Sequence, residues 1–267
     1  MKGRVLIVAG SDSGGGAGIQ ADIKSVTAMG AYAATAITAL TAQDTEGVRA
    51  VHPVPLDFLR LQIRMSLDDI GTDAIKTGML ADSATIDTVC NALEGCTAPL
   101  VADPVMVAKG GARLLAPDAI ETMTRRLLPL AAVLTPNIPE AEALSGLHIP
   151  DLDGMRRAAA TLLRKGARAV LVKGGHMEGA TLHDVLATAE GTEVFDSPRI
   201  ETRHTHGTGC TLASAIAAGL AQGMTLRDAV LRARAYVAAA IRNAPGYGKG
   251  HGPLDHAVTL DPSRLPT

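Results

Sequence analysis

The chain has 267 residues, 47% of them hydrophobic and 19% charged, a composition that excludes a disordered or fibrous protein. Its 25 basic and 27 acidic residues form no long block of one sign, which argues against a nucleic-acid or membrane surface and favours a small neutral or locally anionic ligand. With no Trp, two Phe and three Tyr, the chain also has few aromatic platforms for single-stranded nucleic acid.

Short apolar runs alternate along the chain with segments whose apolar residues recur at helical spacing. The first run, residues 5–9, leads through a glycine-rich turn into a helix predicted for residues 19–29. A repeated strand–helix order is typical of parallel strands joined by crossover helices, and it predicts an α/β fold. Further strands are predicted at residues 74–76, 100–103, 132–135 and 168–173, a hairpin-like pair at 181–188 and 192–196, and further helices at 83–93, 117–128, 139–145, 154–165, 209–222 and 226–242.

No linker, repeat or low-complexity segment divides the chain, so residues 1–267 are expected to form one domain. The first apolar run is too short for a signal peptide, and no apolar stretch reaches the ~18 residues of a membrane span. Cys90, Cys96 and Cys210 form no metal-type pair and are odd in number, which argues against a disulfide framework. A cytoplasmic protein is therefore expected.

Polar side chains follow the ends of four predicted strands, in residues 10–12 and at Asp103, Asn137 and Lys173. Open α/β sheets bind ligands at the carboxyl ends of their strands. The binding site is therefore expected along this edge of the sheet.

Residues 13–18 read Ser-Gly-Gly-Gly-Ala-Gly between a strand and a helix. Glycines let the backbone approach a ligand closely, and a helix N-terminus can receive an anion. The spacing is not a dinucleotide fingerprint, because Ile19 occupies the place of its last glycine, and the chain has no G-x-x-x-x-G-K-[ST] motif. We expect a ligand-binding loop, with a flexible turn as the alternative.

Residues 205–211, Thr-His-Gly-Thr-Gly-Cys-Thr, open a predicted apolar helix. The amides from Gly207 to Cys210 are suited to a phosphoryl group, whose developing charge the helix dipole would stabilise. The same dipole is expected to lower the pKa of Cys210, which can then act as general base toward a substrate hydroxyl. The alternative is a capped helix with an incidental buried cysteine.

Asp103 ends a predicted strand, and Glu140 lies three residues after Asn137. Residues three apart share one face of a helix, so Asn137 can offer its amide to phosphate and Glu140 its carboxylate to a hydrated Mg²⁺. Asp103 is a second candidate metal carboxylate, and Lys173 is suited to neutralise phosphate. The ordinary alternatives are a capping box, a turn and a solvated lysine.

Together these segments resemble the ribokinase-like kinases, and within them the hydroxymethylpyrimidine and phosphomethylpyrimidine kinases of thiamine biosynthesis. The similarity covers residues 4–256. Sugar kinases of the superfamily generally carry aspartate where this chain has Cys210, so the resemblance is to the vitamin-precursor branch. The matching stretches, in the family's order, are residues 9–22, 37–43, 76–80, 103–106, 134–141, 173–176 and 206–211.

The resemblance implies a three-layer α/β/α sandwich with a mostly parallel central sheet, in a homodimer that uses ATP and Mg²⁺. It implies phosphorylation of 4-amino-5-hydroxymethyl-2-methylpyrimidine and then of its monophosphate. The implied site residues are Gln43, Gly10, Asp22, Met79 and Val105 for the pyrimidine, Asn137, Lys173 and Thr208 for the ATP phosphates, Asp103 and Glu140 for Mg²⁺ and water, and Cys210 with the amides of Gly207 and Gly209 for catalysis.

Two other functions stay open. Some members of the same branch with a Gly-Thr-Gly-Cys loop accept pyridoxine-type rings, so a pyridoxine, pyridoxal or pyridoxamine kinase is the main alternative. The other is a non-catalytic pyrimidine-binding regulator, against which the intact set of polar residues argues.

Overall fold

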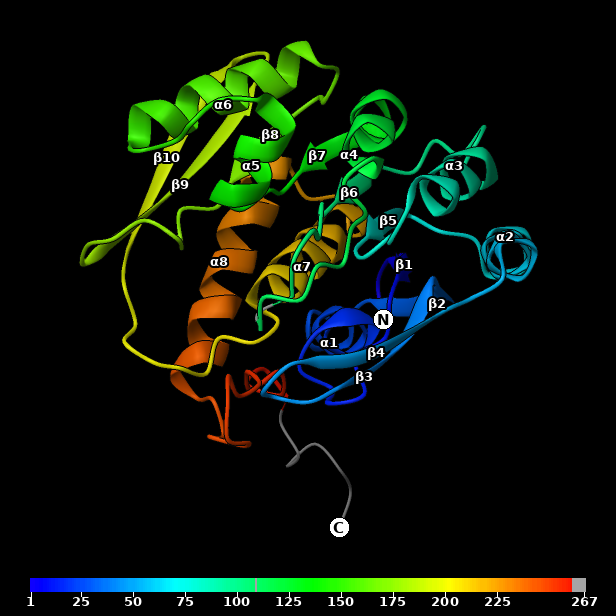
Figure 1. Cartoon of the computed structure of the whole chain (residues 1–267), viewed down its shortest axis with the longest axis horizontal. Helices are drawn as coiled ribbons and strands as arrows, with labels where there is room; N and C mark the ends of the chain where they lie inside the picture. The colour runs from blue at the N-terminus through cyan, green and yellow to red at the C-terminus, as the bar shows by residue number, and fades with distance from the viewer. Residues whose placement is uncertain (109, 261–267) are drawn as a thin grey trace.

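An eight-stranded sheet forms the centre of the computed structural model, which describes residues 1–108 and 110–260 (Figure 1). Its strands are β1 (Arg4–Ala9), β2 (Tyr32–Ile37), β5 (Ala74–Thr77), β6 (Leu100–Ala102), β7 (Ala131–Leu134), β8 (Val170–Val172), β9 (Thr181–Thr188) and β10 (Gly191–Pro198). The order across the sheet is β10-β9-β8-β7-β6-β5-β1-β2. Neighbours from β2 to β8 run parallel, whereas β9 and β10 pair antiparallel, which confirms the predicted sheet and its hairpin.

Strand β1 shows why these apolar runs form a sheet that is buried on both faces. Leu6 and Val8 belong to one hydrophobic cluster, and Val5, Ile7 and Ala9 belong to another. Alternate residues of a strand face opposite sides, so an apolar run without polar interruptions is typical of a strand covered on both faces by helices.

Helices cover the two faces of the sheet and complete a three-layer α/β/α sandwich (Figure 1). This architecture is the one that the resemblance implied. One face is covered by α1 (Gly18–Ala28), α7 (Thr208–Ala221) and α8 (Leu226–Arg242), and the other by α2 (Leu56–Met65), α3 (Ser83–Ala92), α4 (Ala119–Thr122), α5 (Ile138–Ser145) and α6 (Leu152–Arg164).

A separate hairpin is formed by β3 (Ala39–Gln43) and β4 (Val48–Pro53), which pair antiparallel. The N–H of Ser11 donates to the carbonyl of Ala39 at 2.9 Å, so the hairpin is attached where β1 ends. The sequence patterns predicted no element between residues 30 and 73. The reason is that β2 and β3 are rich in Ala and Thr and β4 is largely exposed, so none of them has a clear apolar alternation.

The helix predicted for residues 117–128 is instead α4 followed by a π-helical turn (Met123–Leu127) and a 3₁₀ turn (Leu128–Leu130). Pro129 has no backbone N–H to continue a regular helix. Another π-helical turn (Ser66–Ile70) extends α2. Within the described ranges, no helix is both long and apolar enough to span a bilayer.

Candidate active site

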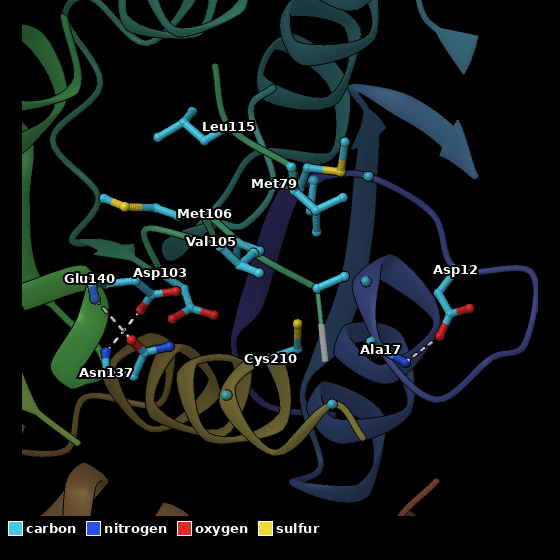
Figure 2. Close-up of a pocket in the computed structure, with 18 of the residues that line it drawn as sticks. Asp12, Ala17, Met79, Asp103, Val105, Met106, Leu115, Asn137, Glu140 and Cys210 are labelled. Carbon is cyan, nitrogen blue, oxygen red and sulfur yellow. Dashed lines mark hydrogen bonds between the residues drawn. The ribbon is translucent and has the colours of Figure 1, made fainter. Parts of the chain in front are cut away.

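A cavity of about 880 Å³ lies at the carboxyl ends of β1, β5, β6, β7 and β8, the edge that the strand ends predicted. Every predicted site residue except Asp22 lines it. Figure 2 shows Asp103, Asn137 and Glu140 grouped on one side, with Cys210 at the start of α7 between this group and Ala17. Met79 and Val105 contribute apolar wall.

The glycine-rich loop wraps around a carboxylate of the protein itself. Asp12 accepts hydrogen bonds from the N–H groups of Gly14, Gly16 and Ala17 at 2.8, 3.0 and 2.8 Å. Ala17 and Gly18 line the cavity, whereas Gly14, Gly15 and Gly16 do not. The predicted ligand-binding loop therefore contributes only its last residues to the cavity, and its glycines serve to enclose Asp12.

Asp12 forms a buried pair with His206, whose Nε2 donates to Asp12 Oδ2 at 2.8 Å. Burial alone would raise the pKa of Asp12, but His206 and the amides of the loop hold it below its usual value. Gln43 Nε2 lies 3.4 Å from the same imidazole nitrogen. Because that nitrogen already donates to Asp12, it cannot accept from Gln43, so His206 does not occupy the amide N–H groups of Gln43 at the cavity wall.

The turn before α7 packs directly on the glycine-rich loop. Gly207 adopts a left-handed conformation with φ of 82°, and a Cβ there would lie 1.8 Å from the carbonyl oxygen of Gly16. The first amides of a helix have no intrahelical acceptor; that of Thr208 donates to the carbonyl of Thr205 at 3.4 Å, and those of Gly209 and Cys210 are suited to an anion in the cavity. This geometry fits the predicted anion hole.

A lysine and a carboxylate meet in front of this helix terminus. Lys173 Nζ donates to Asp103 Oδ1 at 2.9 Å, and Thr135 Oγ1 donates to the same oxygen at 3.1 Å. A Cβ at Gly209 would lie 3.2 Å from Lys173 Nζ and 3.7 Å from Asp103 Oδ2. Glycine at this position therefore lets both charged groups approach the start of α7.

Asn137 and Glu140 form the capping box that was the alternative to their functional interpretation. Asn137 Oδ1 accepts from the N–H of Glu140 at 3.0 Å, and Glu140 Oε2 accepts from the N–H of Asn137 at 2.8 Å. Both residues nevertheless line the cavity. Burial raises the pKa of Glu140 to about 7, although Lys173 opposes the shift.

Asp22, which the resemblance places in the pyrimidine pocket, lies beneath the cavity instead. Its carboxylate accepts from Lys76 Nζ at 2.8 and 2.9 Å and from Ser214 Oγ at 2.7 Å, and it is fully buried. Lys76 lines the cavity floor. Asp22 therefore acts on the site through Lys76 and does not itself line the site.

The prediction that the pKa of Cys210 is lowered is wrong. Burial raises the pKa of this thiol to about 12, and although Lys76 favours the thiolate, the carboxylates of Asp22 and Asp103 add to the rise. Desolvation together with two nearby negative charges outweighs the groups that favour the thiolate. The site therefore holds a neutral thiol.

The sequence profile of the phosphomethylpyrimidine kinase family matches residues 12–255. The chain belongs to this family. It is 51% identical over 264 residues to the thiamine biosynthesis bifunctional protein ThiED of Geobacter sulfurreducens, covering 98% of this chain but only 54% of that protein. It is 48% identical over 256 residues to the hydroxymethylpyrimidine/phosphomethylpyrimidine kinase of Streptomyces coelicolor, covering 96% and 95% of the two chains.

Among solved structures, an ADP complex of Bacillus subtilis pyridoxal kinase is similar, with a TM-score of 0.91 and 37% identity over 98% of this chain and 100% of that one. The ribokinase-like fold implied by the resemblance is thereby confirmed. The sequence identity to this pyridoxal kinase is lower than to the Geobacter sulfurreducens and Streptomyces coelicolor proteins.

In this member of the phosphomethylpyrimidine kinase family, the polar side of the cavity suits a nucleotide phosphate and a hydrated cation. Within residues 1–108 and 110–260, no three His, Cys, Asp or Glu side chains are grouped closely enough to hold a metal by themselves. Mg²⁺ commonly keeps several waters and uses one or two carboxylates together with phosphate oxygens. Asp103 and Glu140 fit that requirement.

Sequence reasoning placed residues 10–12 at the binding edge but missed Lys76 and the pairing of Asp12 with His206. Lys76 stands in a matching stretch, residues 76–80, and its position inside an apolar strand was the available signal, since a buried lysine needs a partner. Asp12 and His206 are 194 residues apart, so no local pattern links them.

Proposed function

We propose that this chain is an ATP-dependent kinase that phosphorylates 4-amino-5-hydroxymethyl-2-methylpyrimidine and then the resulting monophosphate, for thiamine biosynthesis. The main support is that one cavity, in a chain of this family, contains Gln43, the Lys173–Asp103 ion pair and Cys210 at a helix N-terminus. Gln43 is suited to bind an aminopyrimidine ring. The ion pair and Cys210 are suited to phosphoryl transfer.

Ring recognition is assigned to the Gln43 side of the cavity. An amide can donate to a ring nitrogen and accept from an exocyclic amino group at the same time. Met79 and Val105 lie on the apolar wall, and Gly10 allows close approach because a Cβ there would lie 3.0 Å from Met79 Sδ. This arrangement suits a flat ring in a chain that is poor in aromatic residues.

In the first step, the hydroxyl oxygen of the pyrimidine attacks the γ-phosphorus of ATP, the bond to the bridging oxygen of ADP breaks, and the hydroxyl proton must leave. Cys210 is assigned to receive that proton, for which its thiol must first release its own proton to solvent and become a thiolate. Lys76 and the amides at the start of α7 are the groups that favour the thiolate. The same amides, with Lys173, stabilise the charge of the transferring group.

In the second step, a phosphate oxygen of the monophosphate attacks the γ-phosphorus, and ADP leaves again. This oxygen is already ionised near neutral pH, because the second pKa of a phosphomonoester is about 6. The second step therefore needs positioning and charge neutralisation and no general base.

Asn137, Lys173 and Thr208 are assigned to the ATP phosphates, and Asp103 and Glu140 to Mg²⁺ through water. When bound, Mg²⁺ neutralises phosphate charge and orients the γ-phosphoryl group. Asp103 Oδ1 is already used by Lys173 and Thr135, so Oδ2 is the oxygen left for a hydrated cation.

A pyridoxal kinase is the second candidate, because the structural similarity to the Bacillus subtilis pyridoxal kinase is high. An ATP-consumption assay with Mg²⁺ separates the two functions when it is run on the pyrimidine alcohol, its monophosphate and pyridoxal, with product masses measured. Formation of the pyrimidine diphosphate supports our proposal. If only pyridoxal gives a product, the protein is a pyridoxal kinase and the proposed pyrimidine substrate is wrong. If no ATP is consumed with any acceptor, a non-catalytic pyrimidine-binding protein is favoured.

We also propose that residues 1–267 act as one kinase domain in a cytoplasmic homodimer. Phe58, Leu61 and Met65, spaced along α2, expose 56%, 52% and 64% of their surface, and such an apolar stripe is suited to a second copy. Light scattering after gel filtration tests the dimer. A Leu61→Glu variant should be monomeric if α2 forms the interface.

A further inference from the structure

The two acceptors of the proposed reaction differ chiefly in charge. The pyrimidine alcohol carries no phosphate, whereas its monophosphate carries a charge of about −1.5 to −2 at neutral pH. If the proposed function holds, one cavity must therefore bind a neutral acceptor and a dianion in turn. A cation in its lining would serve the second acceptor.

Most cationic groups on the cavity wall already have an acidic partner. Lys76 is paired with Asp22, and Lys173 is paired with Asp103. Of the lysines and arginines among the described lining residues, Arg113 is the one with no carboxylate within ion-pair distance. Its side chain is exposed at the cavity wall, so its guanidinium can reach an incoming anion.

The backbone around Arg113 is fixed to the cavity although its side chain is exposed. Arg113 forms an antiparallel bridge with Val107, and the N–H of Leu114 donates to the carbonyl of Met106 at 2.8 Å. The N–H of Ala116 donates to the carbonyl of Ala81 at 2.8 Å. Arg113 is therefore presented from a defined position and not from a free loop.

Described residues near Arg113 reach both the phosphate side and the ring side of the cavity. Val105 lies two residues after Asp103 and lines the cavity, and Gly110 packs on the β3–β4 turn, where its Cβ would lie 3.0 Å from the carbonyl oxygen of Glu46. Gln43 lies three residues before Glu46. The phosphate of a monophosphate acceptor must lie between the ring held near Gln43 and the γ-phosphate of ATP, and Arg113 lines the same cavity as Gln43 and Lys173.

We propose that Arg113 binds the phosphate of the phosphomonoester acceptor and is required for the second phosphorylation but not for the first. A guanidinium presents parallel N–H groups that match two phosphate oxygens, and its charge persists at any working pH. The alcohol offers Arg113 no anion. The residue therefore raises affinity for the charged acceptor without affecting the neutral one.

The test compares the wild type with Arg113→Gln and Arg113→Lys, measuring kcat and KM for each acceptor and for ATP. For Arg113→Gln we expect KM for the monophosphate to rise about ten- to hundredfold, the range for a lost charge-assisted hydrogen bond. The kcat/KM for the alcohol should change by less than about twofold, as for a surface substitution. Arg113→Lys should give an intermediate rise in KM for the monophosphate, because lysine keeps the positive charge but lacks the two parallel N–H groups of the guanidinium.

Arg156→Gln is the matched control, because Arg156 lies on α6, is half exposed and does not line the cavity. Equal KM values for the monophosphate in Arg113→Gln and the control would overturn the proposal. A rise in KM for ATP with both acceptors would also overturn it, by placing Arg113 on the nucleotide.

Calorimetric binding of the pyrimidine monophosphate without ATP separates this failure from a failure of the proposed function. A wild type that neither binds nor phosphorylates this ligand would overturn both proposals. A wild type that does both, with an Arg113→Gln variant that binds equally well, would overturn the role of Arg113 alone.

Discussion

Lys76 Nζ lies 2.8 and 2.9 Å from the two carboxylate oxygens of Asp22, and both side chains are fully buried. Ser214 donates to the same carboxylate from a position four residues after Cys210, and hence one turn further along α7. Burial alone would lower the pKa of Lys76, but the carboxylates of Asp22 and Asp103 raise it, so the lysine stays charged. The pair thus holds the Lys76 ammonium group in place near the N-terminal end of α7.

The first prediction concerns this ion pair. Asp22→Asn leaves Lys76 buried without a countercharge, and removal of one member of a buried pair typically costs about 3–5 kcal/mol. We expect a loss of this size in the free energy of unfolding, measured with urea. The double variant Asp22→Asn with Lys76→Met should recover much of the loss, because it removes the uncompensated charge. An unchanged unfolding midpoint for Asp22→Asn would refute this account.

Much of the fold could be predicted because the strands that form it are short apolar runs. The run from Val5 to Ala9 is apolar throughout because both faces of β1 are covered. Such a run can be recognised from the local sequence alone, without knowing which elements pack against it. The β3–β4 hairpin carries Gln43, yet it is half exposed and gives no such signal. Gln43 was therefore assigned through the family resemblance and not through its local sequence.

The site could be predicted where residues end strands or begin a helix, as in residues 205–211. Asp103, Asn137 and Lys173 follow strands that meet at one edge, so their proximity follows from the topology. The electrostatics depend on burial and on distant partners, which a local pattern does not contain. For this reason the ionisation of Cys210 was predicted in the wrong direction and the burial of Asp22 was missed.

The second prediction concerns Cys210 and separates the two phosphorylations. Cys210→Ala should lower kcat for the pyrimidine alcohol by about 10²–10⁴-fold, the usual contribution of a general base. The monophosphate is an ionised nucleophile, so its kcat should fall by no more than about tenfold. Stopped assays with each acceptor, and product masses, measure both values. An equal loss for the two acceptors would show that Cys210 acts in positioning and not as a base.

The third prediction compares two glycines of one turn. A Cβ at Gly209 would meet the flexible end of Lys173 at 3.2 Å, so Gly209→Ala should fold and raise KM for ATP by displacing Lys173 from the anion hole. A Cβ at Gly207 would meet the backbone of Gly16 at 1.8 Å in a left-handed conformation, so Gly207→Ala should lose about 2 kcal/mol or more of stability. Thermal unfolding and ATP kinetics on both variants distinguish the two effects. Equal stability of the variants would contradict the proposed packing of the two loops.

The last prediction concerns Glu140, whose pKa is raised by burial to about 7 from an ordinary value of 4.5. As the pH is lowered from about 7 to 4.5, the Glu140 carboxyl takes up a proton in the folded state, while the same group in the unfolded state is still largely ionised. The folded state then binds more protons than the unfolded one, so Glu140 makes stability fall as the pH rises through this window. Glu140→Gln keeps an oxygen to accept from the N–H of Asn137 and removes the buried charge.

The variant should therefore be more stable than the wild type at pH 8, by about 1–3 kcal/mol, because one pKa unit corresponds to about 1.4 kcal/mol. The difference should close as the pH falls from 7 toward 4.5, and urea unfolding across this range measures it. Activity should change in the opposite sense, because the proposed role beside hydrated Mg²⁺ needs the ionised carboxylate, so Glu140→Gln should lose turnover at pH 8. This loss should shrink as the pH falls below about 7 and the wild-type carboxyl takes up its proton. A variant less stable than the wild type at pH 8 would mean that the ionised carboxylate stabilises the fold through Lys173, with a pKa below its ordinary value.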